Sequence, residues 1–169
     1  EAFKWYRKGA EQGHAKAQYA VGQMHERGDR LPYDGKMAVE WYRRAAEAGL
    51  AGAQSRLGAM YASGMFVPQN DREAALWFAR AGAQGDAIAQ YHLGLFYEVG
   101  RGLSQDVGAA IAWYRAAAGN GHSIAQNNLG LLYDSGLGVP EDPSAARDWY
   151  RRAAEQGDSN GQFNLALSL

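Results

Sequence analysis

The four histidines are the side chains whose spacing most directly tests for catalytic chemistry. They are His14, His25, His92 and His122. A helical zinc site of the H-E-x-x-H type needs two histidines four residues apart, and no pair has that spacing. Cysteine is absent, which excludes a thiol nucleophile, a disulfide and any cysteine-based metal site. We therefore predict no catalytic residue, no metal site and no cofactor.

The glycine-rich and charged segments offer no other chemistry. Gly100-Arg101-Gly102 is not followed by G-K-[ST], so it does not form a phosphate-binding loop. The chain carries 17 basic and 18 acidic residues, and this balance argues against a broad cationic face for nucleic acid. No apolar run approaches about 18 residues, so we predict no membrane insertion.

Tryptophan and glutamine both recur along the chain at a constant spacing of 36 residues. The tryptophans are Trp5, Trp41, Trp77, Trp113 and Trp149. The glutamines are Gln18, Gln54, Gln90, Gln126 and Gln162. A fixed period of roughly 20 to 50 residues is the signature of a solenoid or repeat array. We therefore predict an all-α solenoid of 36-residue helix-turn-helix repeats.

One repeat, taken from Gly121 to Gln156, contains two helical patterns. In the first, apolar residues recur at i, i+4, i+7 and i+8 until Gly136, where the helix is expected to end. In the second, Asp142 is the expected N-cap before Pro143, and Trp149 lies on an apolar face. The other repeats have Asp34, Asn70 and Asp106 at the same cap position. Each repeat is thus predicted to be two antiparallel helices that bury their tryptophan.

The period divides the whole chain, 1–169, as a single predicted solenoid. Residues 1–12 match the second helix of a repeat, and residues 157–169 match the first helix of a fifth. Four full repeats lie between them, at 13–48, 49–84, 85–120 and 121–156. Neither end resembles a polar capping repeat, so we expect a segment of a longer protein or ends covered by another chain.

The repeat motif is specific enough to compare with known families. It reads A-x-A-Q-x-x-L-G-x-x-Y-x-x-G, a loop with V-P and D, and A-x-x-W-Y-x-x-A-A-x-x-G, as in SIAQNNLGLLYDSGLGVPED and AARDWYRRAAEQG. This pattern resembles the Sel-one-like repeat (SLR) family, a relative of the tetratricopeptide (TPR) repeats, over the whole chain. The resemblance implies a right-handed α/α superhelix, a scaffold or adaptor role and no catalysis. It also favours a bacterial periplasmic, envelope or signalling context.

By analogy with the first helix of a TPR repeat, residues at fixed offsets from the repeated glutamine are expected to face a concave groove. These positions vary between repeats while their neighbours do not, as expected of a binding face on a fixed scaffold. The candidate partner-binding residues are Tyr19, Gln23, Ser55, Ile88, Tyr91, Leu95, Glu98, Asn127, Leu131, Asp134 and Phe163. Glu98 and Asp134 favour a basic end on a bound peptide.

Two interpretations remain open for the apolar members of this set. Ile88, Leu95 and Leu131 either line an exposed groove or pack between adjacent first helices. Burial of both Leu95 and Leu131 would exclude the groove. The arginines on the second helices form either a solvated face or a basic ridge for an acidic partner.

The predicted function is a non-catalytic scaffold or adaptor that binds a protein or peptide in the groove. A second interpretation is a structural spacer that self-associates end to end. A hydrolase, suggested by resemblance to a few family members, is the third. It would need a clustered nucleophile and base, for which the sequence offers no motif.

Overall fold

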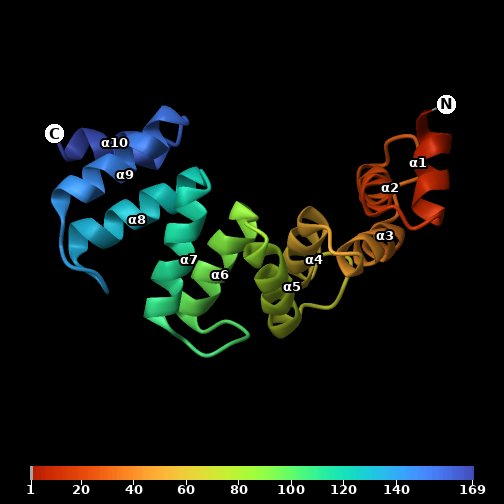
Figure 1. The fold of residues 1–169 in the computed structure, drawn as a ribbon, viewed down its shortest axis with the longest axis horizontal. Coiled ribbons are helices and arrows are strands. Elements are labelled where there is room, and N and C mark those ends of the chain that lie inside the picture. Colours follow the sequence, from red (N-terminus) through yellow and green to blue (C-terminus); the bar gives the residue numbers. More distant parts are fainter. Residues whose placement is uncertain (1) are drawn as a thin grey trace. The chain divides into compact units, whose positions relative to one another are not determined.

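The computed structural model describes residues 2–169, which form ten α-helices and no strand (Figure 1). The helices are α1 (Ala2–Glu11), α2 (Ala15–Arg27), α3 (Gly35–Glu47), α4 (Ala51–Ser63), α5 (Asp71–Ala83), α6 (Ala87–Val99), α7 (Val107–Gly119), α8 (Ser123–Ser135), α9 (Pro143–Glu155) and α10 (Ser159–Leu167). They group into two compact units, unit 1 (Glu1–Gln84) and unit 2 (Gly85–Leu169). The predicted all-α repeat fold is confirmed.

Polar caps begin the second helices and glycines end the first helices, as the sequence predicts. The Asp34 carboxylate accepts the Met37 N–H at 3.0 Å, and the Asp106 carboxylate accepts the Ala109 N–H at 2.9 Å. Asn70 and Asp142 cap α5 and α9 in the same way. The first helices α2, α4, α6 and α8 end at glycines with a left-handed backbone: Gly28, Gly64, Gly100 and Gly136. Glycine takes this conformation without the steric cost of a Cβ atom.

The two helices of a repeat meet where a glycine faces a buried aromatic ring. The pairs are Gly22–Tyr42 and Gly58–Phe78 in unit 1, and Gly94–Tyr114 and Gly130–Tyr150 in unit 2. A Cβ atom on Gly130 would lie only 2.5 Å from Cε1 of Tyr150, closer than van der Waals contact allows. The repeated glycine therefore sets the spacing between the two helices.

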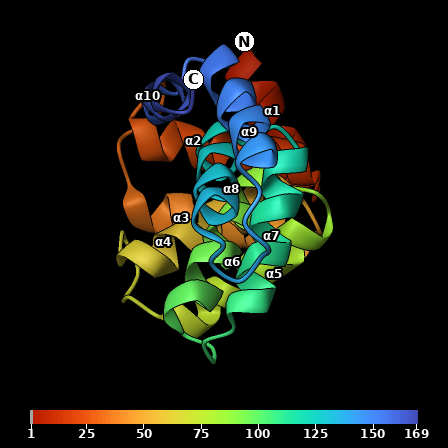
Figure 2. The ribbon, with the colours of Figure 1, turned by 90° about the vertical axis from the view of Figure 1, so that its left-hand side faces the viewer.

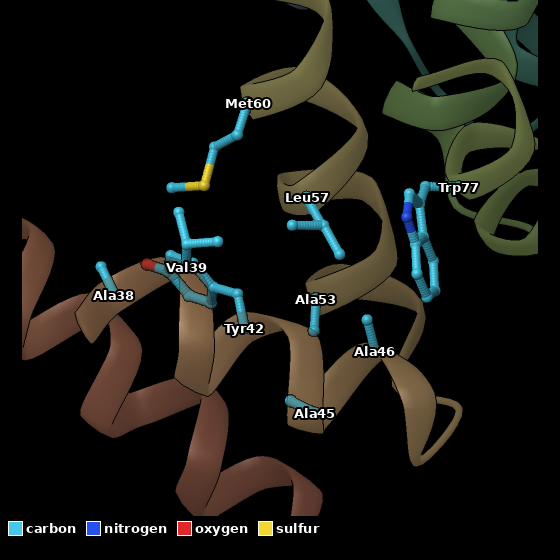
Figure 3. Close-up of a cluster of buried hydrophobic side chains, with 9 residues drawn as sticks. All are labelled: Ala38, Val39, Tyr42, Ala45, Ala46, Ala53, Leu57, Met60 and Trp77. Atoms are coloured by element: carbon cyan, nitrogen blue, oxygen red, sulfur yellow. The ribbon is translucent and has the colours of Figure 1, made fainter. Parts of the chain in front are cut away.

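The core of unit 1 lies where α3, α4 and α5 meet. Figure 3 shows Leu57 and Met60 of α4 pointing toward Val39 of α3, with the Trp77 ring from α5 near Ala46. Small alanine side chains on α3 and α4 allow these helices to pack closely.

Unit 2 has the same arrangement, in which α6 packs against α7, α8 against α9, and α10 against both α8 and α9 (Figure 1, Figure 2). Its core includes Ala125 and Leu129 of α8, with Tyr91 and Trp149 partly buried against them. The predicted burial of every tryptophan is only partly right. Trp41 and Trp77 are buried, Trp113 and Trp149 are half-buried, and Trp5 is 68% exposed on α1.

A buried hydrogen-bond ladder explains why the glutamine repeats. The Gln54 amide donates to the Ala46 carbonyl at 3.0 Å, and its Oε1 accepts from Nε2 of Gln84 at 2.8 Å. The equivalent bonds in unit 2 join Gln126 to Ala118 and Gln156, and Gln90 to Asn120. Gln54 and Gln126 thus link their repeat to the preceding one, and each bond satisfies polar groups that are shielded from water.

Candidate functional site

The strongest candidate surface lies on the first helices of unit 2. Ile88 of α6 is 56% exposed, and Ile124 and Leu131 of α8 are 43% and 45% exposed. Leu95 is half-buried, so neither Leu95 nor Leu131 is buried, and packing between helices does not account for the whole apolar stripe. The stripe and the charged residues beside it form the unit 2 face, defined as Ile88, Leu95, Glu98, Val99, Ile124, Leu131 and Asp134.

Two candidate residues do not lie on an exposed surface. Ser55 is 7% exposed and Asn127 is 4% exposed, so their placement in an open groove was wrong. Asn127 is covered because its Oδ1 accepts a 2.8 Å hydrogen bond from Nδ2 of Asn164 on α10. The side chain directly after the repeated glutamine is therefore buried by its neighbours in these two repeats.

Tyrosines at that same position are half-buried. In unit 1, the Tyr19 ring lies 5.3 Å from the Tyr42 ring. In unit 2, the Tyr91 ring stacks on His122 with centroids 4.6 Å apart and an interplanar angle of 18°. Desolvation raises the pKa of the Tyr91 hydroxyl, with Asn128 and Glu98 as smaller influences. Tyr91 therefore supports the unit 2 face from its edge.

Glu98 has a structural partner that the sequence analysis missed. The Tyr114 hydroxyl donates to Oε2 of Glu98 at 2.5 Å, and burial with this bond raises the pKa of Tyr114 far above its ordinary value. In unit 1 the Tyr42 hydroxyl donates to Glu26 in the same way, at 2.6 Å. The sequence contains a sign of this pairing, because the two positions change together. The repeat that has Phe78 in place of tyrosine also has Ala62 in place of glutamate.

The corresponding surface of unit 1 is more basic. Gln23 lines a surface pocket of about 230 Å³ together with Met24, Arg27 and Asp29. The Glu26 carboxylate there accepts a hydrogen bond from the Tyr42 hydroxyl and forms an ion pair with the Arg56 guanidinium. Lys16 and Arg27 are exposed on the same helix. This surface therefore differs in sign of charge from the unit 2 face.

Two further candidates are exposed in unit 2. Asp134 is exposed near the C-terminal end of α8, where burial first and then the negative charge of Asp134 raise the pKa of the Tyr150 hydroxyl. Phe163 projects from α10 and is also exposed. Asp134 is therefore the carboxylate of the unit 2 face that is available to a partner.

Of the two histidines beside this face, His122 caps a helix. Nδ1 of His122 accepts the Ala125 N–H at 3.2 Å and so caps α8. Desolvation lowers the pKa of both His92 and His122, although Asp86 opposes the shift in each case. Within residues 2–169, no group of three His, Cys, Asp or Glu side chains is placed to hold a metal ion.

Three arginines of the second helices, Arg44, Arg80 and Arg152, lie over the tryptophan of their own helix. The guanidinium carbon of Arg44 lies 4.6 Å from the Trp41 ring centroid, and that of Arg80 lies 4.6 Å from the Trp77 ring centroid. Arg44 also pairs with Glu40 at 3.1 Å. These contacts favour a solvated face over a basic ridge. None of the helices in residues 2–169 is long and apolar enough to cross a membrane.

Two solved structures combine high similarity in fold and in sequence with this chain. The protective antigen c5321 of uropathogenic Escherichia coli, which has an SLR fold, is 40% identical over 97% of this chain with a TM-score of 0.89. A Sel1 repeat protein from Oxalobacter formigenes is 36% identical over 92% of this chain with a TM-score of 0.84. The chain spans only 35% and 64% of these two proteins.

More distant comparisons show the fold alone. Helicobacter pylori cysteine rich protein B is 19% identical, with a TM-score of 0.58 over 73% of this chain and 89% of its own. No curated protein matches the chain. The Sel1 repeat model matches residues 1–14, 15–50, 51–86, 87–122 and 123–158. These matches cover most of the sequence, so the chain belongs to the Sel1 repeat family.

Proposed function

We propose that this chain is a non-catalytic interaction module that binds a peptide or protein segment on its first helices. Sel1 repeat proteins are generally scaffolds that mediate protein interactions. The observation that carries the proposal is the exposure of Ile88, Ile124 and Leu131 beside repeated positions that are buried. Large apolar side chains exposed together on one kind of helix are typical of interaction sites.

The proposed contact residues are those of the candidate set that a partner could reach. Ile88, Leu95 and Leu131 would supply apolar contact area in unit 2, and Asp134 would supply charge. Tyr91 would hold the edge of this surface through its stack on His122. In unit 1, Gln23 lines a surface pocket, so a partner could also reach this side chain.

The test selects ligands without assuming their identity. Short random peptides displayed on phage are selected on the immobilised chain, and the dissociation constants of enriched peptides are measured by fluorescence anisotropy. The variant Ile88→Asp is compared with Leu76→Asp. Leu76 has the same exposed fraction, 56%, but lies on the second helix α5.

Ile88→Asp is expected to weaken binding by at least about tenfold, since a charge would replace an apolar contact, whereas Leu76→Asp is expected to leave it unchanged. Circular dichroism of both variants checks that the helices are retained. An equal effect of the two substitutions, or the absence of any enriched peptide, would overturn the proposal.

A second candidate function is a structural spacer that self-associates. It is favoured by the exposed rings of Trp5 on α1 and Phe163 on α10, which would gain burial in a larger assembly. Light scattering across a range of chain concentrations distinguishes the two. Self-association raises the mean mass with concentration, whereas peptide binding leaves the mass of the free chain constant.

A further inference from the structure

The first and second helices of unit 2 differ in net charge. Its first helices and their N-caps contain four acidic residues and no lysine or arginine: Asp86, Glu98, Asp134 and Asp158. The second helices α7 and α9 with their N-caps are balanced, holding four arginines and four acidic residues: Arg115, Arg147, Arg151, Arg152, Asp106, Asp142, Asp148 and Glu155. The side of unit 2 that exposes apolar residues is therefore also its anionic side.

Groups that could neutralise this side are few. Desolvation lowers the pKa of both His92 and His122, which disfavours their cationic forms. Arg101 follows α6, and its guanidinium carbon lies 5.0 Å from the Phe96 ring centroid. Glu98 keeps its hydrogen bond to Tyr114. Asp134 is thus the exposed carboxylate at one end of the stripe that contains Ile124 and Leu131.

We infer that the unit 2 face binds an apolar peptide segment that carries lysine or arginine. This inference rests on the proposed function and names the chemistry of its partner. Isoleucine and leucine side chains of the face bury the apolar part of the segment, and Asp134 pairs with its cation. The negative sign of the face disfavours acidic segments and anionic membrane surfaces through like-charge repulsion.

The experiment uses the peptides enriched by selection on the whole chain. Enriched sequences are expected to combine aliphatic residues with lysine or arginine and to be depleted of aspartate and glutamate. For the tightest such peptide, Asp134→Asn is compared with Glu155→Gln, which removes an exposed carboxylate from the second helix α9. Asp134→Asn is expected to weaken binding about 2- to 5-fold, the size of an exposed ion pair, and Glu155→Gln to leave it unchanged.

Added salt should reduce the effect of Asp134→Asn, because screening already weakens the ion pair in the parent chain. Acidic or uncharged enriched peptides that lose affinity in Ile88→Asp would overturn this inference while leaving the proposed function intact. Basic peptides that bind Ile88→Asp and Ile124→Asp as tightly as they bind the parent chain would overturn both. A chain mass that rises with concentration, and falls in Ile124→Asp, would make a second copy the occupant and overturn the inference.

Discussion

Oε1 of Gln18 is buried without a hydrogen-bond donor because Ala48 stands where the later repeats supply a side-chain amide. The later glutamines Gln54, Gln90 and Gln126 each accept from an amide 30 residues further along the chain. For Gln18 that position is Ala48, at the C-terminal end of α3. The Gln18 amide donates to the Ala10 carbonyl, with a distance of 3.3 Å. The glutamine ladder is therefore incomplete at its first step.

Ala48→Gln is expected to stabilise the chain. The new amide would donate to Oε1 of Gln18 and remove the cost of a buried acceptor without a partner, about 1 kcal/mol. Urea unfolding followed by circular dichroism measures the change as an increase in the free energy of unfolding. Gln84→Ala is the matched control, because it removes the donor to Gln54 and should destabilise by a similar amount. A neutral or destabilising Ala48→Gln would contradict this account of the ladder.

Tyr114→Phe is expected to destabilise unit 2 by about 1–3 kcal/mol, because the partly buried Glu98 carboxylate would lose its hydroxyl donor. The double variant Glu98→Ala with Tyr114→Phe should recover part of that loss, since the repeat with Ala62 and Phe78 already has this combination. A double-mutant cycle of urea unfolding measures the coupling. Strictly additive losses would show that the two side chains do not act as a pair.

Acid is expected to destabilise the chain through His122. Desolvation lowers the folded-state pKa of this ring, although Asp158 and Asp86 oppose the shift. Unfolded histidine titrates near about pH 6.5, so the stabilisation is complete above that pH and is lost as the pH falls through the folded pKa. A protonated ring also cannot accept the Ala125 N–H that it binds through Nδ1.

His122→Asp is the informative variant for this titration. Aspartate already caps α6 and α10 at the equivalent positions, Asp86 and Asp158. The urea midpoint should therefore fall less between about pH 7 and about pH 5 than in the parent chain. An unchanged acid dependence would remove His122 from the explanation.

Gly130→Ala is expected to cost about 1–3 kcal/mol, since its Cβ would overlap the buried Tyr150 ring and force the helices apart. Gly119→Ala is the control in the same unit, because no atom lies within 4 Å of the added Cβ. This control should be neutral or stabilising by up to about 1 kcal/mol from helix propensity. Thermal unfolding of both variants checks the prediction, and similar losses in the two would contradict the close-approach role of Gly130.

The sequence predicted the helices and their ends well because caps and glycine stops are local and recur in every repeat. Asp34 and Gly136 act as their types and positions indicate. Burial was less predictable, because it depends on neighbouring helices. Ser55 and Asn127 share a repeat position with Tyr91, yet the two small polar residues are buried and the tyrosine is half-exposed.

The hydrogen-bond partners of the polar side chains also could not be predicted from helical periodicity. The bond from Tyr114 to Glu98 joins residues 16 apart on different helices, and the glutamine ladder joins residues 30 apart. Periodicity shows which face of a helix is apolar, but it does not show which side chains on facing helices meet. The paired change of Phe78 with Ala62 is a trace of such a contact in the sequence.

The central claim is that a partner binds the first helices of unit 2. Methyl nuclear magnetic resonance of the isotope-labelled chain, titrated with the tightest selected peptide, tests it most directly. The methyl signals of Ile88, Ile124 and Leu131 should shift with saturation, while those of Leu76 on the second helix α5 should not. Saturable shifts at Leu76, with Ile88, Ile124 and Leu131 unchanged, would contradict the account.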